Sequence, residues 1–471
     1  MKKALAIVAI FLLLIGLITI AGYTILNKKI DDQEFYVGVT YCGNSVQEAK
    51  DLIDKVKDYT NLFVLQSGSL MTNVDAMNEI GNYVTVSNLS YAVSGGRLNG
   101  DWINSWCIEA KERWGDQFIG IYYYDEPGGD MLDGKPIQLT QKISKQGGTI
   151  SVTDWANGRQ VVYRDNGEIF LRKPDHSLRP VGYLDGITLL WWGSQNTVHY
   201  YPDGTVTVGD IDGDFYTTGN ITECPLSIVP YKEVLKQKPI QNYDDAARAF
   251  VDMNKEQFEV INKQQLNKKD VLVFTADYGL YWWDYKGGYD VVLAELAWNL
   301  SVPQHIGLVR GAANLQGKSW GTILTWKYNV PPFLAEGEEM FEHLKTSYET
   351  GAEYVLIFNY SEDPANPNTL QEEHFLALER FWDEIVQNPE VVHGGIKAEA
   401  VLVLPKNYGY GMRIPNDTIW GIWPADKDSQ RIWNQLQNKI GQYGLKLDIV
   451  FEDPSYSVTG KYPNIYYWDQ K

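Results

Sequence analysis

The chain of 471 residues alternates short apolar runs with amphipathic stretches, and this alternation constrains its fold more than any other feature. In the first third, the apolar runs predict strands at 35–42, 61–68, 83–88 and 118–124. The segments between them predict helices at 46–59, 74–81 and 102–115. Strands that alternate with helices form a parallel sheet, because each helix carries the chain back over one face of the sheet.

The alternation resumes with a long predicted helix at 246–266. Further strands are predicted at 270–277, 304–311, 320–328 and 352–360. Further helices are predicted at 290–300, 336–351 and 372–389. Eight strands with about seven helices predict an α/β fold, a (β/α)8 TIM barrel over residues 33–392. An open doubly wound sheet is the alternative, although such sheets rarely need eight units.

Two regions depart from the barrel pattern. Residues 133–230 are rich in strands and turns, with Asn166-Gly167 and Asp203-Gly204 each placed between alternating runs as hairpin turns. They predict a β-hairpin insertion after strand four, in a loop that carries function in barrels. Residues 396–471 predict a small C-terminal βαβ module without a Gly-rich phosphate loop.

The N-terminal residues 1–30 contain an uncharged apolar stretch at 4–26. Its length suffices to span a bilayer, and it exceeds the usual apolar region of a cleaved signal peptide. We therefore expect a single-pass membrane protein with most of the chain extracytoplasmic. A cleaved signal, and so a secreted protein, is the alternative.

Charge and composition narrow the classes of partner. The net charge of −19 argues against nucleic acid, because phosphate binding needs basic patches. The six histidines are scattered, without the spacing of a metal site, and we expect neither a metal nor a cofactor. The 16 Trp and 31 Tyr fit a sugar-binding surface, although cores also use such residues.

The stretch FIGIYYYDEPGG delivers two acids, Asp125 and Glu126, to the end of predicted strand four. Barrel enzymes carry their catalytic groups at the C-terminal ends of strands, so Glu126 is the first candidate for a general acid/base. The alternative is that Glu126-Pro127 only begins a turn. Neighbours in a regular strand point to opposite faces, and the Pro-Gly-Gly break offers a way around this conflict.

The same rule predicts a set of residues at the mouth of the barrel. The predicted catalytic residues are Glu126, Asp125 and Asp277. The predicted substrate-binding residues are Tyr41, Gln66, Tyr281, Trp282, Trp283, Asp284, Arg310, Trp326, Tyr328, Asn359, Tyr360 and Glu362. Carboxylates protonate the leaving oxygen in glycoside hydrolysis, and aromatic faces stack on sugar rings. Core packing is the alternative for the aromatic loop at 281–283, and Arg310 is expected to pair with a carboxylate at the mouth.

The motif YYYDEP resembles the Asp-Glu pair that ends strand four in β-N-acetylhexosaminidases and related barrel glycosidases. That resemblance implies that Glu126 is the proton donor and that Asp125 orients the substrate's 2-acetamido group as the nucleophile. Another large clan of barrel glycosidases has a nucleophilic Glu at strand seven. Predicted strand seven ends here with Trp326-Lys327-Tyr328, which departs from that pattern.

These features together predict a membrane-anchored glycoside hydrolase-like protein that acts on a glycan. The missing acid at strand seven leaves substrate assistance, or a second carboxylate from strand five or strand eight. It also leaves open a non-catalytic cell-surface protein that binds glycans or a protein partner through a degenerate barrel.

Overall fold

The structure is a computed structural model. With side chains it describes residues 35–95, 102–129, 242–296, 300–324, 327, 334–360, 370–410, 414–415, 417–421 and 423–470. It describes the backbone alone at 100–101, at 130–132 and in the strands between 160 and 230.

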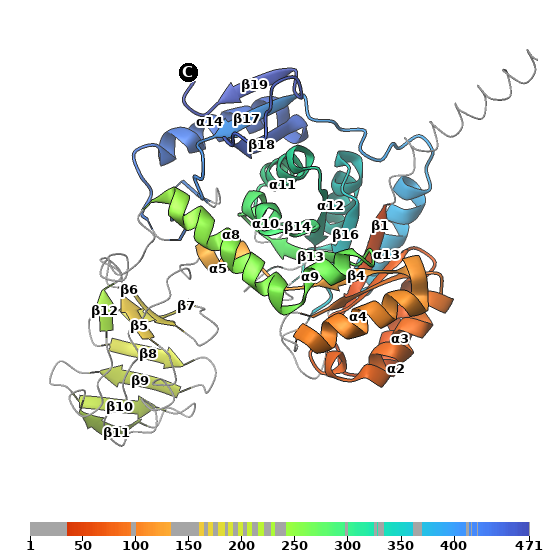
Figure 1. Cartoon of the computed structure of the whole chain (residues 1–471), viewed down its shortest axis with the longest axis horizontal. Helices are drawn as coiled ribbons and strands as arrows, with labels where there is room; N and C mark the ends of the chain where they lie inside the picture. Colours follow the sequence, from red (N-terminus) through yellow and green to blue (C-terminus); the bar gives the residue numbers. More distant parts are fainter. Residues whose placement is uncertain are drawn as a thin grey trace, which may run out of the picture.

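Eight parallel strands close into a barrel (Figure 1). In chain order they are β1 (Tyr36–Tyr41), β2 (Leu62–Leu65), β3 (Ser90–Ser94), β4 (Phe118–Tyr122), β13 (Leu272–Asp277), β14 (Val291–Leu296), β15 (Ser319–Leu324) and β16 (Tyr354–Ile357). Pairing of β1 with β16 closes the ring, with Val39 opposite Ile357. The strands are buried along almost their whole length, as expected for a parallel sheet covered by helices. The predicted TIM barrel is confirmed.

Helices flank the barrel. They are α2 (Val46–Val56), α3 (Val74–Val86), α4 (Gly100–Trp114), α5 (Pro127–Leu132), α8 (Tyr243–Val260), α9 (Lys263–Asn267), α10 (Tyr281–Gly287), α11 (Val302–Gln316), α12 (Gly337–Thr350) and α13 (Glu372–Phe381). Helices α2 and α3 begin at side-chain caps: Ser45 accepts a hydrogen bond from the Glu48 amide, and Asn73 accepts one from the Ala76 amide. Such caps satisfy amide groups that the helix itself cannot pair.

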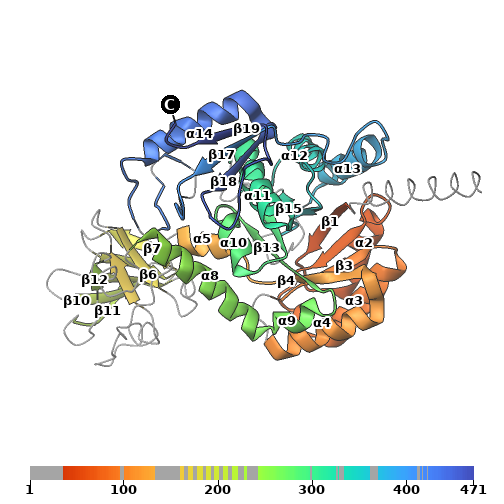
Figure 2. The same cartoon turned by 45° about the horizontal axis from the view of Figure 1, so that its top comes forward.

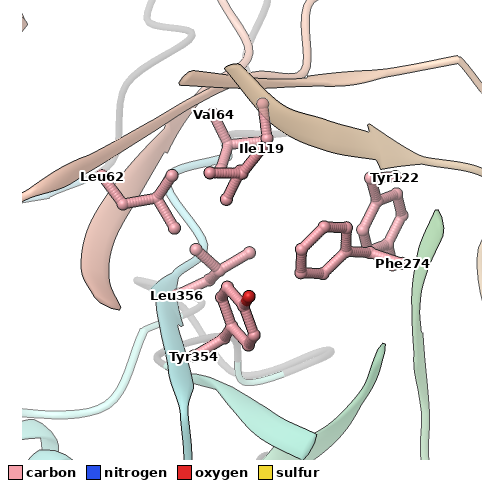
Figure 3. A pocket seen from close by; sticks show the side chains of 8 residues that line it. Leu62, Val64, Ile119, Tyr122, Phe274, Tyr354 and Leu356 are labelled. Carbon is pink, nitrogen blue, oxygen red and sulfur yellow. The ribbon is translucent and has the colours of Figure 1, made fainter. Parts of the chain in front are cut away.

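Apolar side chains fill the inside of the barrel. Figure 3 shows a small cavity there, lined by Leu62, Val64, Ala92, Ile119, Tyr122, Phe274, Tyr354 and Leu356. Apart from the two tyrosine hydroxyls, the lining side chains are hydrocarbon, so polar groups do not converge on this cavity as they do in a ligand site. The interior is a packed core, and barrels of this kind carry their sites at the strand ends.

Three predicted elements are wrong. Residues 83–88 were predicted as a strand, but α3 continues to Val86 and the third strand begins at Ser90. The predicted helix at 290–300 contains the strand β14, and the predicted strand at 304–311 lies within α11. Helix α11 is buried on nearly every side, so its sequence carries no amphipathic pattern to mark it as a helix.

The region from 160 to 230 forms two four-stranded sheets. One has the order β12 (Ile228–Pro230), β5 (Gln160–Tyr163), β6 (Glu168–Arg172), β7 (Leu178–Tyr183). The other has the order β11 (Phe215–Asn220), β10 (Thr205–Gly209), β9 (Asn196–Tyr200), β8 (Ile187–Trp191). Strands β5 and β6 pair antiparallel, as do β9 and β10, so both predicted hairpins are confirmed.

The C-terminal residues form a small parallel sheet. Strands β17 (Ala400–Leu404), β18 (Leu447–Phe451) and β19 (Asn464–Tyr467) take the order β18-β17-β19, and α14 (Ser429–Tyr443) connects the first two. Figure 2 shows this sheet beside α11. The approach is close, because a Cβ built on Gly311 of α11 would lie 2.9 Å from the Ile449 carbonyl oxygen.

The predicted membrane localisation needs correction. In the part of the chain that the structure describes, no helix is long and apolar enough to cross a membrane. The prediction of a single-pass membrane protein is corrected on that finding. The apolar stretch at 4–26 itself lies outside the described residues.

A buried ion pair joins the barrel to the C-terminal sheet and yields a first prediction. The Arg310 Nε lies 2.7 Å from a carboxylate oxygen of Asp448, and both side chains are buried. Replacing Arg310 by alanine is expected to lower the free energy of unfolding by about 3–5 kcal/mol, because Asp448 stays buried and, among the described residues, keeps only the Tyr462 hydroxyl as a side-chain donor. Urea unfolding measures this change. The control Lys446→Ala breaks an exposed ion pair with Glu399 and should leave stability nearly unchanged. Equal losses in the two variants would contradict the prediction.

Candidate active site

The chain leaves β4 through a turn with an unusual backbone. Tyr124 and Glu126 have positive φ angles of 62° and 47°, in the left-handed region that non-glycine residues seldom adopt. The neighbouring strand β13 holds this conformation. The Glu126 amide donates to the Ala276 carbonyl at 3.0 Å, and the Thr275 hydroxyl donates to the Tyr124 carbonyl at 2.6 Å. Backbone strain that the surroundings enforce is typical of functional sites.

This turn resolves the conflict between the two acids. Strand β4 ends at Tyr122, so Asp125 and Glu126 do not follow strand alternation. Both act electrostatically on one further carboxyl group, that of Glu295, and Glu126 shares a hydrogen bond with it. The turn therefore brings both acids to the same place.

Glu295 lies near the end of β14, the sixth strand of the barrel. Burial raises the pKa of Glu295 well above its usual range, and the negative charges of Glu126, Asp125 and Asp277 raise it further. The raised pKa of Glu295 favours its protonated form, which can donate the hydrogen bond that joins Glu295 to Glu126. Such a pair can give a proton with one member and accept one with the other.

Tyr122 links the barrel core to the acids. Its ring lines the apolar cavity of Figure 3, and its hydroxyl donates a hydrogen bond to Asp125 and accepts one from the Ala276 amide. Burial and the charges of Asp125, Glu295 and Glu126 raise the pKa of Tyr122 well above its usual value. The phenol therefore keeps its proton and fixes the orientation of Asp125.

Asp277 lies beneath the turn. Its carboxylate is fully buried and accepts hydrogen bonds from the amides of Gly128 at 2.5 Å, Tyr278 at 2.6 Å and Gly279 at 3.1 Å. Burial raises the pKa of Asp277 to about 6, against the lowering effect of these donors. The side chain thus holds the backbone of the site in place.

Several predicted binding residues serve the scaffold. Tyr41 is buried and donates to the Ser45 carbonyl at 2.8 Å, which ties β1 to the start of α2. Gln66 continues the β1–β2 ladder through its amide, and its side chain is half-buried. The buried Asn359 accepts a hydrogen bond from the Leu370 amide.

Two tyrosines at the strand ends have different surroundings. Tyr281 is buried, with its hydroxyl 2.7 Å from Nδ1 of His305. Tyr360 is 39% exposed, and its ring stacks on Phe358 with the centroids 5.8 Å apart. Tyr360 thus offers an aromatic face to solvent just after β16. The predicted residues Trp326, Tyr328 and Glu362 lie outside the described residues.

The aromatic segment after β13 is packed in the core. Trp282 and Trp283 are buried on α10 against the C-terminal module. The Trp283 ring lies 4.4 Å from Phe451 and 4.7 Å from Trp420, between ring centroids. These buried contacts are the ones that the core-packing alternative predicts.

Two other predictions about this region also need correction. Arg310 lies on α11 and pairs with Asp448, so it does not reach the mouth of the barrel. Asp284 is fully buried on α10, away from solvent, so it cannot contact a substrate without a rearrangement.

Sequence reasoning missed Glu295, although a signal was present. The strand β14 has the sequence VVLAEL, an apolar run with an acid near its end, like FIGIYYYDE at β4. Because residues 290–300 were predicted as a helix, Glu295 was not predicted at a strand end. Among the residues with a defined placement, no group of three or more His, Cys, Asp or Glu side chains is arranged to hold a metal ion.

Comparison with known proteins gives similar barrels at low similarity. No family model and no curated protein matches the chain. The solved structures that resemble it include the β-glycosidase BGL167, with 9% identity, a TM-score of 0.34 and coverage of 72% of this chain and 86% of that one. A structure of the pneumococcal virulence factor StrH has 9% identity, a TM-score of 0.32 and coverage of 74% and 83%. An HpcH/HpaI aldolase from Desulfitobacterium hafniense has 11% identity, a TM-score of 0.28 and coverage of 71% and 89%. Such different activities at such low scores leave the function to be argued from the site itself.

The raised pKa of Glu295 predicts a pH dependence of stability. The folded chain keeps a proton on Glu295 that the unfolded chain releases above its ordinary pKa, so stability falls as pH rises. Glu295→Gln has no such proton to lose. The free energy of unfolding of this variant should therefore fall less steeply with rising pH than that of wild type, and the two slopes should differ by up to about 1.4 kcal/mol per pH unit. Urea unfolding between about pH 5 and pH 8 measures the two slopes. The exposed Glu112→Gln serves as the control, and parallel slopes for Glu295→Gln and wild type would rule out the proton on Glu295.

Proposed function

We propose that this chain is a glycoside hydrolase in which Glu126 and Glu295 supply the acid and the base. The contact between these two carboxyl groups at the C-terminal ends of β4 and β14 carries the proposal. Glycoside hydrolysis needs a protonated carboxyl group beside an ionised one, and a pair that shares one proton provides both.

The reaction follows from that pair. The protonated carboxyl group donates to the glycosidic oxygen while the bond between this oxygen and the anomeric carbon breaks. The ionised carboxylate stabilises the positive charge that develops on the sugar and takes a proton from the attacking water. The water oxygen bonds to the anomeric carbon. A substrate must first separate the two carboxyl groups, since their direct contact leaves no room for a sugar.

Asp125 has a supporting role in this proposal. The Tyr122 hydroxyl fixes its carboxylate beside the pair, where it can orient a polar substituent of the sugar, such as a 2-acetamido group. Tyr360 supplies an exposed aromatic face after β16, and sugars stack on such faces through their apolar C–H groups.

The proposal predicts that each glutamate is needed for hydrolysis. Glu126→Gln and Glu295→Gln should each lower kcat on chromogenic aryl glycosides by about 10²–10⁴, because each removes a group that transfers a proton. The double variant should lose little more than either single variant, since the two carboxyl groups act as a unit. The variant that removes the acid should lose less with a dinitrophenyl leaving group, which departs without a proton.

The control for this screen is Glu112→Gln, at an exposed residue paired with Lys269. It should hydrolyse the same glycosides as the wild-type chain. If wild type hydrolyses a glycoside and both active-site variants keep its rate, the assignment of the pair is wrong. If wild type binds glycans and hydrolyses none of them, the chain is a binding protein.

A further inference from the structure

A second carboxyl pair lies behind the proposed catalytic pair. Asp277 is the last residue of β13, and Asp284 lies in the first turn of α10. Both side chains are fully buried. Neither oxygen of Asp284 receives a hydrogen bond from a donor among the residues that the structure describes, and its carboxyl group meets that of Asp277. Two carboxyl groups in contact can be joined only by a proton.

The proton belongs on Asp284. Asp277 accepts three backbone N–H groups, and a carboxylate suits that role because all its lone pairs are acceptors. Burial and the charge of Asp277 raise the pKa of Asp284 well above its usual range, whereas the three donors work against burial at Asp277. The protonated Asp284 therefore donates to the ionised Asp277.

Among the described residues, the titratable groups that face this pair are one acid and several phenols. They are Glu295 on β14, Tyr281 and Tyr285 on α10, and Tyr289 after it. Burial is the largest cause that raises the pKa of each phenol well above its usual value, so the phenols stay neutral. The raised pKa of Glu295 favours its protonated, neutral form. The proton on Asp284 is thus needed to keep a second buried negative charge out of this region.

Asp277 reaches the turn of the active site through Gly128. The Gly128 amide donates to Asp277 at 2.5 Å, and a Cβ at this position would collide with the same carboxyl group. Gly128 lies two residues after Glu126, whose left-handed backbone needs support from its surroundings. The contact therefore holds one end of the turn that presents Glu126.

We propose that Asp284 is a positioning residue: by donating its proton to Asp277 it keeps Asp277 able to hold the Gly128 amide, and so fixes Glu126 for proton transfer. The consequence for catalysis rests on the proposed function, whereas the clamp on the turn does not. Loss of the Asp284 proton at high pH places two charges side by side in the interior and releases the turn.

Hydrogen–deuterium exchange of the full chain tests the clamp without a substrate. Asp277→Asn should raise the exchange of residues 123–130 at least tenfold and leave β4 protected, because its amide nitrogen faces one of the three donors. Gly128→Ala disturbs the same contact through the added Cβ, and it should raise the exchange of residues 123–130 in the same way. Asp116→Asn, at an exposed residue, is the control. Unchanged exchange at 123–130 in both Asp277→Asn and Gly128→Ala would overturn the clamp.

Asp284→Asn tests the shared proton, because its amide can donate to Asp277 but cannot titrate. Exchange at 123–130, corrected for the intrinsic effect of pH, should rise in wild type between about pH 6 and pH 9 and stay level in Asp284→Asn. On a hydrolysed glycoside, Asp284→Asn should keep the wild-type kcat at low pH and retain activity further into the alkaline range. Asp277→Asn should lower kcat with little change in KM.

These outcomes separate the two proposals. If wild type hydrolyses no glycoside, the proposed function fails, and the exchange measurements still decide whether the pair holds the turn. If Asp284→Asn shows the same pH dependence of exchange as wild type, Asp284 does not carry the proton and the inference is wrong.

Discussion

The pairing of β4 with β13 is the interaction on which the site depends. The two strands are far apart in the chain but adjacent in the barrel, with Leu272 opposite Gly120. Three groups that hold the turn after β4 come from the end of β13: the Ala276 carbonyl, the Thr275 hydroxyl and the Asp277 carboxylate. The left-handed backbone of Glu126 exists because its neighbour in space, and not its neighbour in sequence, supports it.

The electrostatics of this region require proton sharing. Buried carboxylates are costly unless they are paired with cations, satisfied by donors or neutralised. Glu295 and Asp284 have pKa values raised well above the usual range, which favours their neutral forms. Asp277 is instead satisfied by hydrogen-bond donors. Stability given up in this way is typical of catalytic sites, where groups are arranged for a reaction and not for the folded state alone.

The barrel could be predicted from the sequence, because apolar runs at regular spacing indicate strands wherever helices alternate with them. Asp125 and Glu126 could be placed at a strand end for the same reason. The pattern failed at 290–311, where the strand β14 and the helix α11 are both buried and both read as apolar. Trp283 was predicted to bind a sugar because its core contacts could not be foreseen. They are with Phe451 and Trp420, which lie far from Trp283 in the sequence.

Because β14 was predicted as a helix, Glu295 was missed as a candidate residue of the site. The acids of the proposed pair come from β4 and β14, which lie on either side of β13. Direct contact between them requires that the end residue of the middle strand leave the space between its neighbours. Asp277 does so by turning beneath the chain, where it binds three amides and the Asp284 carboxyl group. Asp277, which ends the strand between the two proposed acids, therefore has its hydrogen-bond partners in the interior, as a buried carboxylate requires.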